Sequence, residues 1–395
     1  MVVLKGRRVL IGVTGGIAAY KVAYLVRELK RSGACVRVVM TPFAQNFISS
    51  LTFEVLSGEK VYVDWSEDPL AHINLARWAE VFLIAPCTVN TLSKLAMGIG
   101  DNLLTATALA WEGTMLVAPA ANTVMYKNPA AVENISRLKK MGVHIIEPEW
   151  GRLACEEEGE GKLADLQRLI DWVCFALSPK PLSGKRVLIT CGSTREPIDP
   201  VRFISNHSSG ELGFALARVS RWMGAKVKVI AGFTTAEEPP EIQVEKVSTA
   251  EEMLNAVLSE LSSADVVIMN AAVSDYRPKE VASGKMKKKD MLTLELEKTP
   301  DILKTVGERK GDRFVVGFAL ESEDLLQGGR EKLKEKGADM IVANPLDVMG
   351  AKHHRGYLIT DEKVEEFEFE DKLASAFWIM DRIAQLTSPQ RSQDP

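Results

Sequence analysis

The feature that most constrains this chain is an arrangement that occurs twice. GRRVLIGVTGG (6–16) is echoed by GKRVLITCGST (184–194), and AEVFLIAP (79–86) is echoed by ADVVIMNA (264–271). In both halves, apolar runs of strand length alternate with segments of helical spacing, which is typical of a parallel sheet covered on both faces. A repeat of this length predicts two α/β domains of similar architecture, not an array of short units.

The first half shows the alternation clearly. Apolar runs over Arg8–Thr14, 34–41, 81–86 and 115–119 predict buried strands, and the spacing of apolar residues over 17–31 predicts a helix. Each half is therefore expected to be a doubly wound, mostly parallel sheet of the Rossmann or flavodoxin type.

A break between the halves falls at Ser178–Leu182, where two prolines occur in five residues (SPKPL). Proline pairs favour a linker over a helix or an inner strand. A chain of 395 residues holds two or three domains at roughly 150 residues each. We therefore expect domains at 1–180 and 181–395, although two sheets within one large domain stay an alternative. The polar tail from Thr387 is expected to be frayed.

Composition excludes several classes of function. The 49 Lys and Arg against 53 Asp and Glu give a net charge of −4, so no broad basic surface for nucleic acid or an acidic membrane is expected. No apolar run approaches the ~20 residues that span a bilayer, and the N-terminal pattern is not that of a signal peptide. Five cysteines without a CxxC pair fit a reducing cytoplasm better than disulfides or zinc.

A glycine-rich turn follows the first predicted strand, in Gly12–Ile17. Glycines let the backbone approach a ligand, and the next helix start can hold a phosphate. The spacing is not GxGxxG, and Thr41 and Pro42 stand where a dinucleotide site has an acidic residue. The turn favours a mononucleotide phosphate over NAD, with a plain strand-to-helix turn as the alternative.

Three further residues of the first half carry chemistry. His72 is a candidate acid or base near neutral pH, or else a structural histidine. Asn122 follows the strand at 115–119, where a turn residue is the simpler reading. Cys155 lies in an acidic, glycine-rich loop of the kind that closes over sites, and nearby carboxylates favour its protonated thiol, which suits a proton donor.

The second half has no P-loop, because Gly284-Lys285 is followed by Met286. Lys285, Lys287, Lys288 and Lys289 form the densest basic run, which taken alone reads as a solvated loop. Lys332 and Lys336 are one helical turn apart and share a face.

Longer motifs carry a family resemblance. In the first half, GVTGGIAAYK (12–21), HINLARWAE (72–80), APCTVNTLSKLA (85–96), NTVMYKNPA (122–130) and GRLACEEEGEGK (151–162) resemble the flavin-containing cysteine decarboxylases. In the second half, STREPIDPVRFISNHSSG (193–210), NAAVSDYRP (270–278), KMKK (285–288) and VVGFALE (315–321) resemble phosphopantothenate–cysteine ligase. Together they resemble the bifunctional flavoproteins of coenzyme A biosynthesis.

For the first half, the resemblance implies FMN and decarboxylation of 4′-phosphopantothenoylcysteine to 4′-phosphopantetheine. The chemistry needs a two-electron acceptor, because oxidising the thiol to a thioaldehyde lets the electrons released with CO2 delocalise. His72 then corresponds to a histidine beside the flavin, Asn122 to the residue that binds the substrate carboxylate, and Cys155 to the lid proton donor. The implied FMN contacts are Thr14, Gly15, Gly16, Thr41, Phe43, Thr88 and Thr91.

For the second half, the resemblance implies that CTP, with Mg²⁺ held mainly through its phosphates, activates 4′-phosphopantothenate as an acyl-cytidylate for L-cysteine. Asn206 corresponds to the residue that turns over this intermediate, and Arg202 to a contact with a substrate carboxylate or phosphate. The implied CTP contacts are Ala271, Ala272, Asp275, Lys285, Pro300, Asp301, Ile302, Phe318, Lys332 and Lys336.

The chain departs from the family pattern in three places: Ala121 replaces a methionine, Glu156 a glycine after the lid cysteine, and Glu211 a lysine after Gly210. Peptidyl-cysteine decarboxylases and flavin prenyltransferases share the first architecture but lack the second half. A flavin-containing regulatory or binding subunit without full catalysis is a further alternative, disfavoured because His72, Asn122 and Cys155 are all present. By analogy, a homo-oligomer is expected, a dodecamer built from trimers and dimers.

Overall fold

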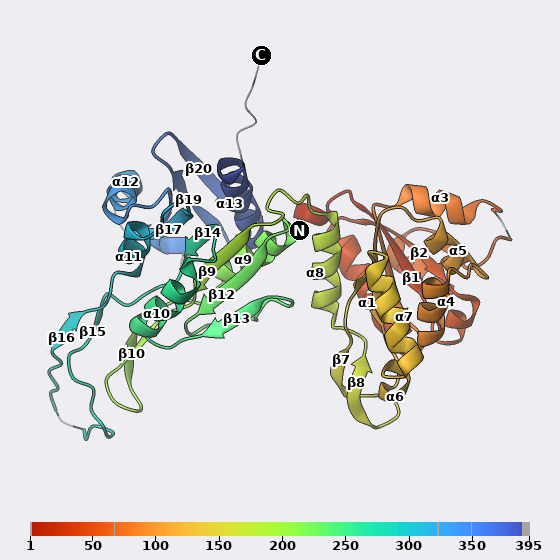
Figure 1. Cartoon of the computed structure of the whole chain (residues 1–395), viewed down its shortest axis with the longest axis horizontal. Coiled ribbons are helices and arrows are strands. Elements are labelled where there is room, and N and C mark those ends of the chain that lie inside the picture. The colour runs from red at the N-terminus through yellow and green to blue at the C-terminus, as the bar shows by residue number, and fades with distance from the viewer. Residues whose placement is uncertain (1, 67, 289, 322–323, 349, 389–395) are drawn as a thin grey trace, which may run out of the picture. The chain divides into compact units, whose positions relative to one another are not determined.

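The computed structural model describes residues 2–66, 68–288, 290–321, 324–348 and 350–388. Contacts divide the chain into two compact units, Met1–Ser178 (unit 1) and Pro179–Pro395 (unit 2) (Figure 1). Among the described residues, no helix is both long and apolar enough to cross a membrane. The predicted frayed tail begins at the last residue of a helix, and from residue 389 on it lies outside the described part of the chain.

Unit 1 is built on a six-stranded sheet of order β3-β2-β1-β4-β5-β6, in which every neighbouring pair is parallel. This is the strand order of a doubly wound dinucleotide-binding fold, and it confirms the predicted class. The strands are β1 (Arg8–Val13), β2 (Cys35–Met40), β3 (Val61–Tyr62), β4 (Val81–Cys87), β5 (Thr114–Pro119) and β6 (His144–Ile145).

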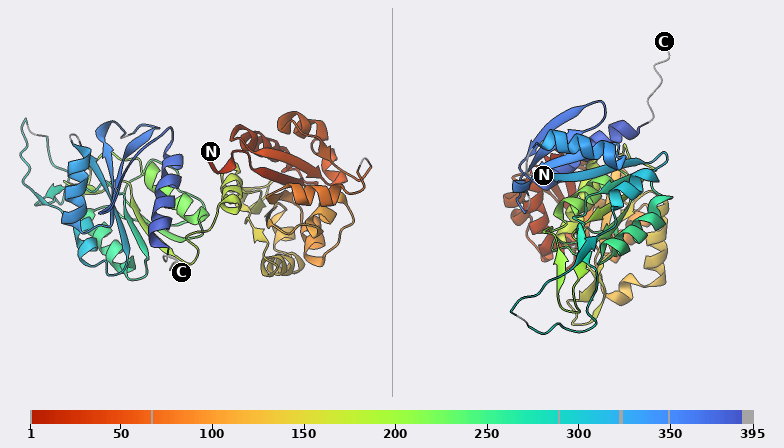
Figure 2. Two further views of the ribbon diagram at one scale, coloured as in Figure 1. Left: turned by 90° about the horizontal axis from the view of Figure 1, so that it is seen from above. Right: turned by 90° about the vertical axis from the view of Figure 1, so that its left-hand side faces the viewer.

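Helices lie on both sides of this sheet (Figure 2). They are η1 (Val2–Leu4), α1 (Ala19–Arg31), η2 (Pro42–Asn46), α2 (Ser50–Ser57), α3 (Ala71–Trp78), α4 (Val89–Met97), α5 (Leu103–Leu109), α6 (Thr123–Tyr126), α7 (Pro129–Lys140) and α8 (Leu166–Leu177). β4 is buried over its whole length, as expected of a strand with helices on both faces. The helix predicted from Ile17 begins at Ala19, because the glycine turn continues through Ala18.

An antiparallel hairpin of β7 (Glu149–Arg152) and β8 (Glu158–Lys162) stands apart from the main sheet. Its turn carries Cys155. Two glycines of β8 let it lie against the segment after β5: a Cβ on Gly159 would be 2.2 Å from Oγ1 of Thr123, and one on Gly161 would be 2.1 Å from the carbonyl oxygen of Ala121. These close approaches explain why glycines alternate in EGEGK.

Unit 2 is built on an eight-stranded sheet of order β13-β12-β9-β14-β17-β18-β19-β20. The first six strands are parallel, and β19 and β20 extend the sheet with antiparallel pairings. The strands of this unit, with those of two small hairpins, are β9 (Arg186–Cys191), β10 (Arg195–Pro197), β11 (Phe203–Ser205), β12 (Lys226–Ala231), β13 (Gln243–Lys246), β14 (Val266–Met269), β15 (Tyr276–Pro278), β16 (Leu296–Lys298), β17 (Phe314–Glu321), β18 (Met340–Pro345), β19 (His354–Ile359) and β20 (Val364–Phe369).

Helices again lie on both sides of the sheet (Figure 2). They are α9 (Glu211–Trp222), α10 (Ala250–Leu261), α11 (Ile302–Glu308), α12 (Leu325–Lys336), η3 (Leu346–Val348) and α13 (Lys372–Thr387). The two cores are separate clusters, one around Phe82 and Ile84 and one around Val267 and Ile341.

The repeated sequences occupy equivalent places in the two sheets. β1 and β9 come from the glycine-containing pair of repeats (6–16 and 184–194), and β4 and β14 come from the second pair (79–86 and 264–271). β4 pairs with β1 in the same way as β14 pairs with β9. The residue before each flanking strand is acidic: Glu80 accepts a hydrogen bond from the main-chain N–H of Arg8 (2.9 Å), and Asp265 accepts one from Arg186 (2.7 Å). The echo in the sequence is therefore an echo of topology.

Candidate active sites

A cavity of about 600 Å³ in unit 1 opens where three parallel strands end. Gly16 reaches it after β1, Thr88 after β4 and Asn122 after β5, and Cys155 reaches it from the hairpin turn. Ligands of open α/β sheets bind at this edge. Four predicted site residues from separate parts of the sequence thus line one cavity.

Thr14 ties two of these strand ends together. It is fully buried, and its hydroxyl donates to the carbonyl oxygen of Pro86 (2.6 Å) and accepts from the main-chain N–H of Thr88 (2.9 Å). Thr88 in turn caps α4 by accepting from the N–H of Thr91 (3.3 Å). Thr14 therefore shapes the site by joining the ends of β1 and β4.

The other predicted flavin contacts do not line the cavity. Gly15 packs against Phe43, because a Cβ on Gly15 would come within 2.5 Å of that ring. Phe43 is itself 62% exposed on η2, whereas Thr41 and Thr91 are buried. Contacts from these residues to a flavin stay a prediction.

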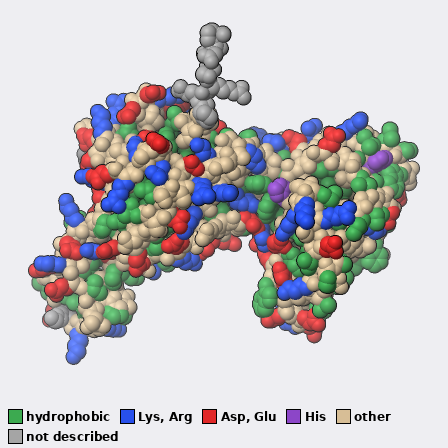
Figure 3. All heavy atoms as spheres, viewed as in Figure 1, with side chains coloured by type: hydrophobic (Ala, Val, Ile, Leu, Met, Phe, Trp, Pro, Cys, Tyr) green, Lys and Arg blue, Asp and Glu red, His purple; other side chains and the backbone are tan. Residues whose placement is uncertain are grey.

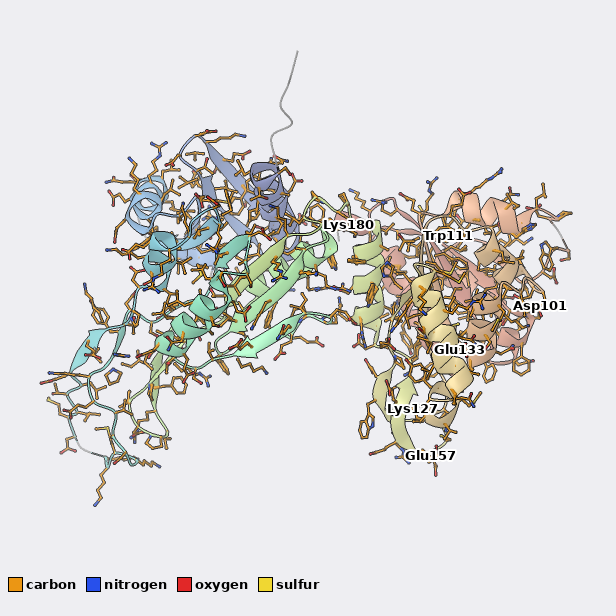
Figure 4. The ribbon with its side chains drawn as sticks, viewed as in Figure 1. Asp101, Trp111, Lys127, Glu133, Glu157 and Lys180 are labelled. Atoms are coloured by element: carbon orange, nitrogen blue, oxygen red, sulfur yellow. The ribbon has the colours of Figure 1, made fainter. Side chains whose placement is uncertain are left out.

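Asn122 links the end of β5 to the hairpin through its side-chain hydrogen bonds. The Asn122 side-chain oxygen caps α6 by accepting from the N–H of Val124 (2.8 Å). Its Nδ2 donates both to Sγ of Cys155 (3.3 Å) and to Oε2 of Glu157 (2.8 Å), and the Cys155 thiol lies 3.5 Å from the same carboxylate oxygen. Figure 4 shows Glu157 at the tip of the hairpin. The asparagine is thus both a cap, the simpler reading of the sequence, and a donor toward the cysteine.

Glu156 is held in a conformation that favours glycine. Its φ is 68°, in the left-handed region that side chains with a Cβ adopt at a cost of roughly 1–2 kcal/mol. The resemblance implies a glycine here, so this departure coincides with a strained backbone directly beside Cys155.

His72, on α3, is absent from the lining of the cavity. Nε1 of Trp65 donates to its Nδ1 at 3.2 Å. Because Nδ1 accepts, the neutral ring carries its hydrogen on Nε2. The structure thus orients His72 for chemistry at Nε2, but this chain alone does not bring it together with Asn122 and Cys155.

Burial separates the cysteines into inert and accessible ones. It raises the pKa of the Cys87 thiol far above its usual range and, with a smaller effect of Glu238, that of Cys191 to about 12. Cys35 and Cys155 are exposed. Of these two, only Cys155 lines the cavity.

The cavity has the donors that an anionic flavin needs. Lys21 of α1, Arg152 of β7 and Lys162 of β8 line it. The main-chain N–H groups of Ile17 and Ala18, at the start of α1, have no acceptor in the described part of the chain. A helix start of this kind suits a phosphate, and the remaining lining is largely apolar, as a ring system requires. The three cations went unrecognised in the sequence, although each lies within a motif already singled out.

A second cavity, of about 520 Å³, opens at the carboxyl ends of the parallel strands of unit 2. Residues predicted for the nucleotide line it together: Ala271, Asp275, Pro300, Asp301, Ile302, Phe318, Lys332 and Lys336. Ala272 and Lys285 are outside this lining. The main-chain N–H of Ala272 instead donates to the carbonyl of Gly192 (2.8 Å).

The charges in this cavity are fixed in place. Nζ of Lys336 lies 2.8 Å from Oδ2 of Asp301 and 2.7 Å from Oε1 of Glu335. Burial opposes ionisation of Asp301, but the hydrogen bonds from Lys336 and from the main chain of Lys304 outweigh it and lower its pKa. The pair sits at the start of α11, whose N-cap is Asp301.

Ser274 has a buried hydroxyl group without a hydrogen-bond partner among the described residues. It lines the cavity and is 1% exposed. Buried polar groups are normally satisfied. Together with two lysines, this orphaned hydroxyl fits a polar, anionic occupant such as a nucleotide.

Asn206 lies beside this cavity, and Arg202 contacts the residue that follows Lys285. Nδ2 of Asn206 donates to the carbonyl of Val273 (2.9 Å), which is a lining residue. Arg202 pairs with Asp199, and its Nη1 also donates to the carbonyl of Met286 (3.3 Å), next to Lys285. Lys289, the end of the basic run, falls outside the described residues.

Glu211, the third departure from the family pattern, has a cationic partner. Its Oε2 lies 2.8 Å from Nζ of Lys372, whose side chain is 9% exposed. Glu211 at the start of α9 is thus paired with Lys372 at the start of α13.

The two sheets define a tandem α/β protein with a cavity at the strand ends of each unit. The family described as Flavoprotein matches residues 2–178, and the family described as DNA/pantothenate metabolism flavoprotein C-terminal domain matches residues 182–386. The coenzyme A biosynthesis bifunctional protein CoaBC of Bacillus subtilis is 42% identical, with 97% of this chain and 98% of that protein aligned. The protein of the same name from Vibrio parahaemolyticus is 40% identical over 98% of this chain and 100% of its own length.

The chain therefore belongs to the family of bifunctional flavoproteins of coenzyme A biosynthesis, which confirms the resemblance drawn from the motifs.

Proposed function

We propose that unit 1 decarboxylates 4′-phosphopantothenoylcysteine to 4′-phosphopantetheine with FMN, and that unit 2 makes that substrate from 4′-phosphopantothenate, L-cysteine and CTP. The observation that carries the first activity is the convergence of Asn122 and Cys155 at one cavity. The gathering of the predicted nucleotide residues around the second cavity supports the other.

In unit 1, the Asn122 amide holds the substrate carboxylate, since Asn122 lines the cavity and its amide carries two donor hydrogens. FMN, when bound, would supply a reversible two-electron acceptor for the substrate thiol. Cys155 gives its proton to the enethiolate that forms after CO2 has left. The cavity residues keep water from the carbon that has lost CO2. Lys21, Arg152 and Lys162 supply positive charge for the phosphates and carboxylate involved.

In unit 2, Lys332 and Lys336 hold the CTP phosphates, and Phe318 flanks the base. Mg²⁺ enters with the triphosphate. The substrate carboxylate attacks the α-phosphorus with loss of pyrophosphate, and the amine of cysteine then attacks the acyl-cytidylate with loss of CMP. Asn206 donates to the oxyanion that develops in the second step.

We further propose that unit 1 works as a homo-oligomer in which a second copy brings its His72 to the Asn122–Cys155 cavity. Two observations support this. His72 does not line the cavity of its own chain, and exposed apolar side chains repeat every four residues through η2, the turn after it and α2, at Phe43, Phe47, Leu51 and Val55. Figure 3 shows hydrophobic side chains reaching the surface of unit 1. The dodecamer of trimers and dimers is the assembly we expect.

Two separate assays test the proposal. The purified protein with 4′-phosphopantothenate, L-cysteine, CTP and Mg²⁺ should release pyrophosphate, and with 4′-phosphopantothenoylcysteine alone it should release CO2. Pyrophosphate without CO2 in either assay would mean that unit 1 is a flavin-binding subunit without catalysis. Light scattering at several protein concentrations tests the assembly, and a monomer that decarboxylates would contradict it.

A further inference from the structure

Asp199 is a buried carboxylate outside both cavities. It is 2% exposed, and it lies in the turn that joins β10 to β11. Its Oδ1 accepts from the main-chain N–H groups of Val201 and Arg202, each at 2.8 Å. Its Oδ2 accepts from Nη1 of Arg202 and from the N–H of Met286 (3.1 Å).

These contacts join two segments that lie far apart in sequence. Met286 is 87 residues beyond Asp199, in the loop between β15 and β16 that carries the lysine run. The same junction includes a hydrogen bond from the N–H of Ala282 to the carbonyl of Ile198 (3.0 Å) and one from Arg202 to the carbonyl of Met286 (3.3 Å). Asp199 is the charged centre of the junction.

The carboxylate is held in its ionised form. Burial opposes ionisation, but hydrogen bonds from the main chain of Val201, Met286 and Arg202, together with the Arg202 side chain, lower its pKa to about 2. Charge-assisted bonds of this kind are stronger than neutral ones. Removing the charge therefore weakens the hold on both the arginine and the loop.

We propose that Asp199 is a positioning residue for the ligase reaction, which sets Arg202 and docks the loop of Lys285 over the nucleotide. This inference rests on the proposed function of unit 2. Asp199 itself touches neither substrate nor nucleotide. It fixes the distance between a group that binds the acid substrate and a group that binds the triphosphate, so that the carboxylate and the α-phosphorus meet.

Asp199→Asn tests the charge, since the amide oxygen can still accept from the turn. We expect the KM for CTP to rise and kcat to fall, together by roughly 10- to 100-fold in kcat/KM, because small misplacements of reacting groups cost that much. The KM for L-cysteine should change little. Glu280→Gln, an exposed carboxylate of the same loop, is the matched control and should behave as the unchanged protein.

Met286→Pro tests the loop contact without altering the carboxylate, because proline lacks the N–H that Asp199 accepts. Its control is Met291→Pro, at a position 84% exposed in the same loop. Trypsin cleavage after Lys287 and Lys288, followed without any substrate, reports the position of the loop independently of catalysis. Asp199→Asn and Met286→Pro should both speed this cleavage, and the two controls should not.

Unchanged CTP kinetics and unchanged cleavage in both variants would overturn the positioning role, provided that the unaltered protein releases pyrophosphate. Absence of pyrophosphate from the unaltered protein would instead overturn the proposed ligase function. If unit 2 of Asp199→Asn does not fold, as judged by loss of its cooperative melt, Met286→Pro decides alone. Normal cleavage and kinetics in that variant would reject the inference.

Discussion

The side-chain amide of Asn122 reaches Sγ of Cys155 across 3.3 Å, although the two residues are 33 positions apart. Asn122 is fixed by its own cap of α6, and Cys155 is carried by the turn of a hairpin whose glycines pack against the same segment. The segment after β5 and the hairpin are therefore packed together. As a result, Asn122, which we assign to the substrate carboxylate, lies beside Cys155, which we assign as the final proton donor.

Cys155→Ser should separate decarboxylation from reduction. Serine keeps the shape but is a far weaker acid, so we expect formation of 4′-phosphopantetheine to fall by roughly 10²- to 10⁴-fold. CO2 should still be released, once per bound flavin without air and repeatedly where O2 reoxidises the flavin. The two products can be measured in the same reaction by mass spectrometry and CO2 trapping. Cys35→Ser, at the other exposed thiol, is the control and should leave both unchanged. Equal loss of both products would contradict the role of Cys155 as the late proton donor.

Glu157→Ala should improve substrate binding. The Glu157 carboxylate occupies the amide of Asn122 at 2.8 Å, so a substrate carboxylate that uses this amide must displace it. Removing the competitor releases about 1 kcal/mol, which lowers the KM for 4′-phosphopantothenoylcysteine roughly fivefold. Glu158→Ala is the neighbouring control. A KM that is unchanged or higher in Glu157→Ala would show that the substrate does not use this amide.

Much of the fold could be predicted because its signals are local. Apolar runs and glycine turns marked β1, β4, β9 and β14, and the repeat indicated two domains of similar architecture before any contact was known. The residues around the second cavity followed from the family resemblance. Ala271 and Asp275 come after β14 and Asp301 caps α11, and parallel strands gather such positions at one edge.

The parts that could not be predicted depend on contacts between distant segments. Nothing near Asp199 in sequence indicates that it receives the N–H of Met286, and the contact of Glu157 with Asn122 depends on the register of a hairpin. The partner of His72 is a tryptophan seven residues earlier, on a segment without regular helical or strand spacing. Such pairings arise from tertiary packing, and the type of a single residue does not reveal which distant residue it will contact.

Trp65→Phe should weaken the orientation of His72. It removes the donor to Nδ1 but keeps an aromatic ring against the imidazole. Loss of one hydrogen bond costs about 1 kcal/mol, so CO2 release should fall roughly fivefold. Nitrogen-15 NMR of the imidazole should also show a mixture of tautomers in place of the Nε2–H form. Trp78→Phe is the control, and an unchanged tautomer in Trp65→Phe would contradict this account of His72.

His354 should make unit 2 less stable in acid. It is 2% exposed, between Asn344 (2.8 Å from Nε2) and Ser375 (2.5 Å from Nδ1). Burial, with smaller effects of Lys372 and His353, lowers its pKa to about 4. Below its usual value of about 6.5, the unfolded chain binds a proton that the folded chain does not. The contribution of neutral His354 to the free energy of unfolding is therefore fully present above pH 6.5. It falls by about 3 kcal/mol as the pH decreases from 6.5 to 4.

Urea unfolding of the full chain between pH 4 and 7 measures this loss, and the comparison with His354→Asn separates it from the titration of carboxylates. The variant should start less stable but show a shallower decline between pH 6.5 and 4. Parallel declines in the two proteins would show that the His354 proton does not contribute.

The most direct test of the central claim follows carbon dioxide and pyrophosphate together in one coupled reaction. With 4′-phosphopantothenate, CTP, Mg²⁺ and L-cysteine labelled in its carboxyl carbon, the protein should release one labelled CO2 for each pyrophosphate, and 4′-phosphopantetheine should accumulate in the same amount. A protein that releases neither would contradict the account of both sites. Pyrophosphate with a stable accumulation of 4′-phosphopantothenoylcysteine would contradict the account of the Asn122–Cys155 cavity.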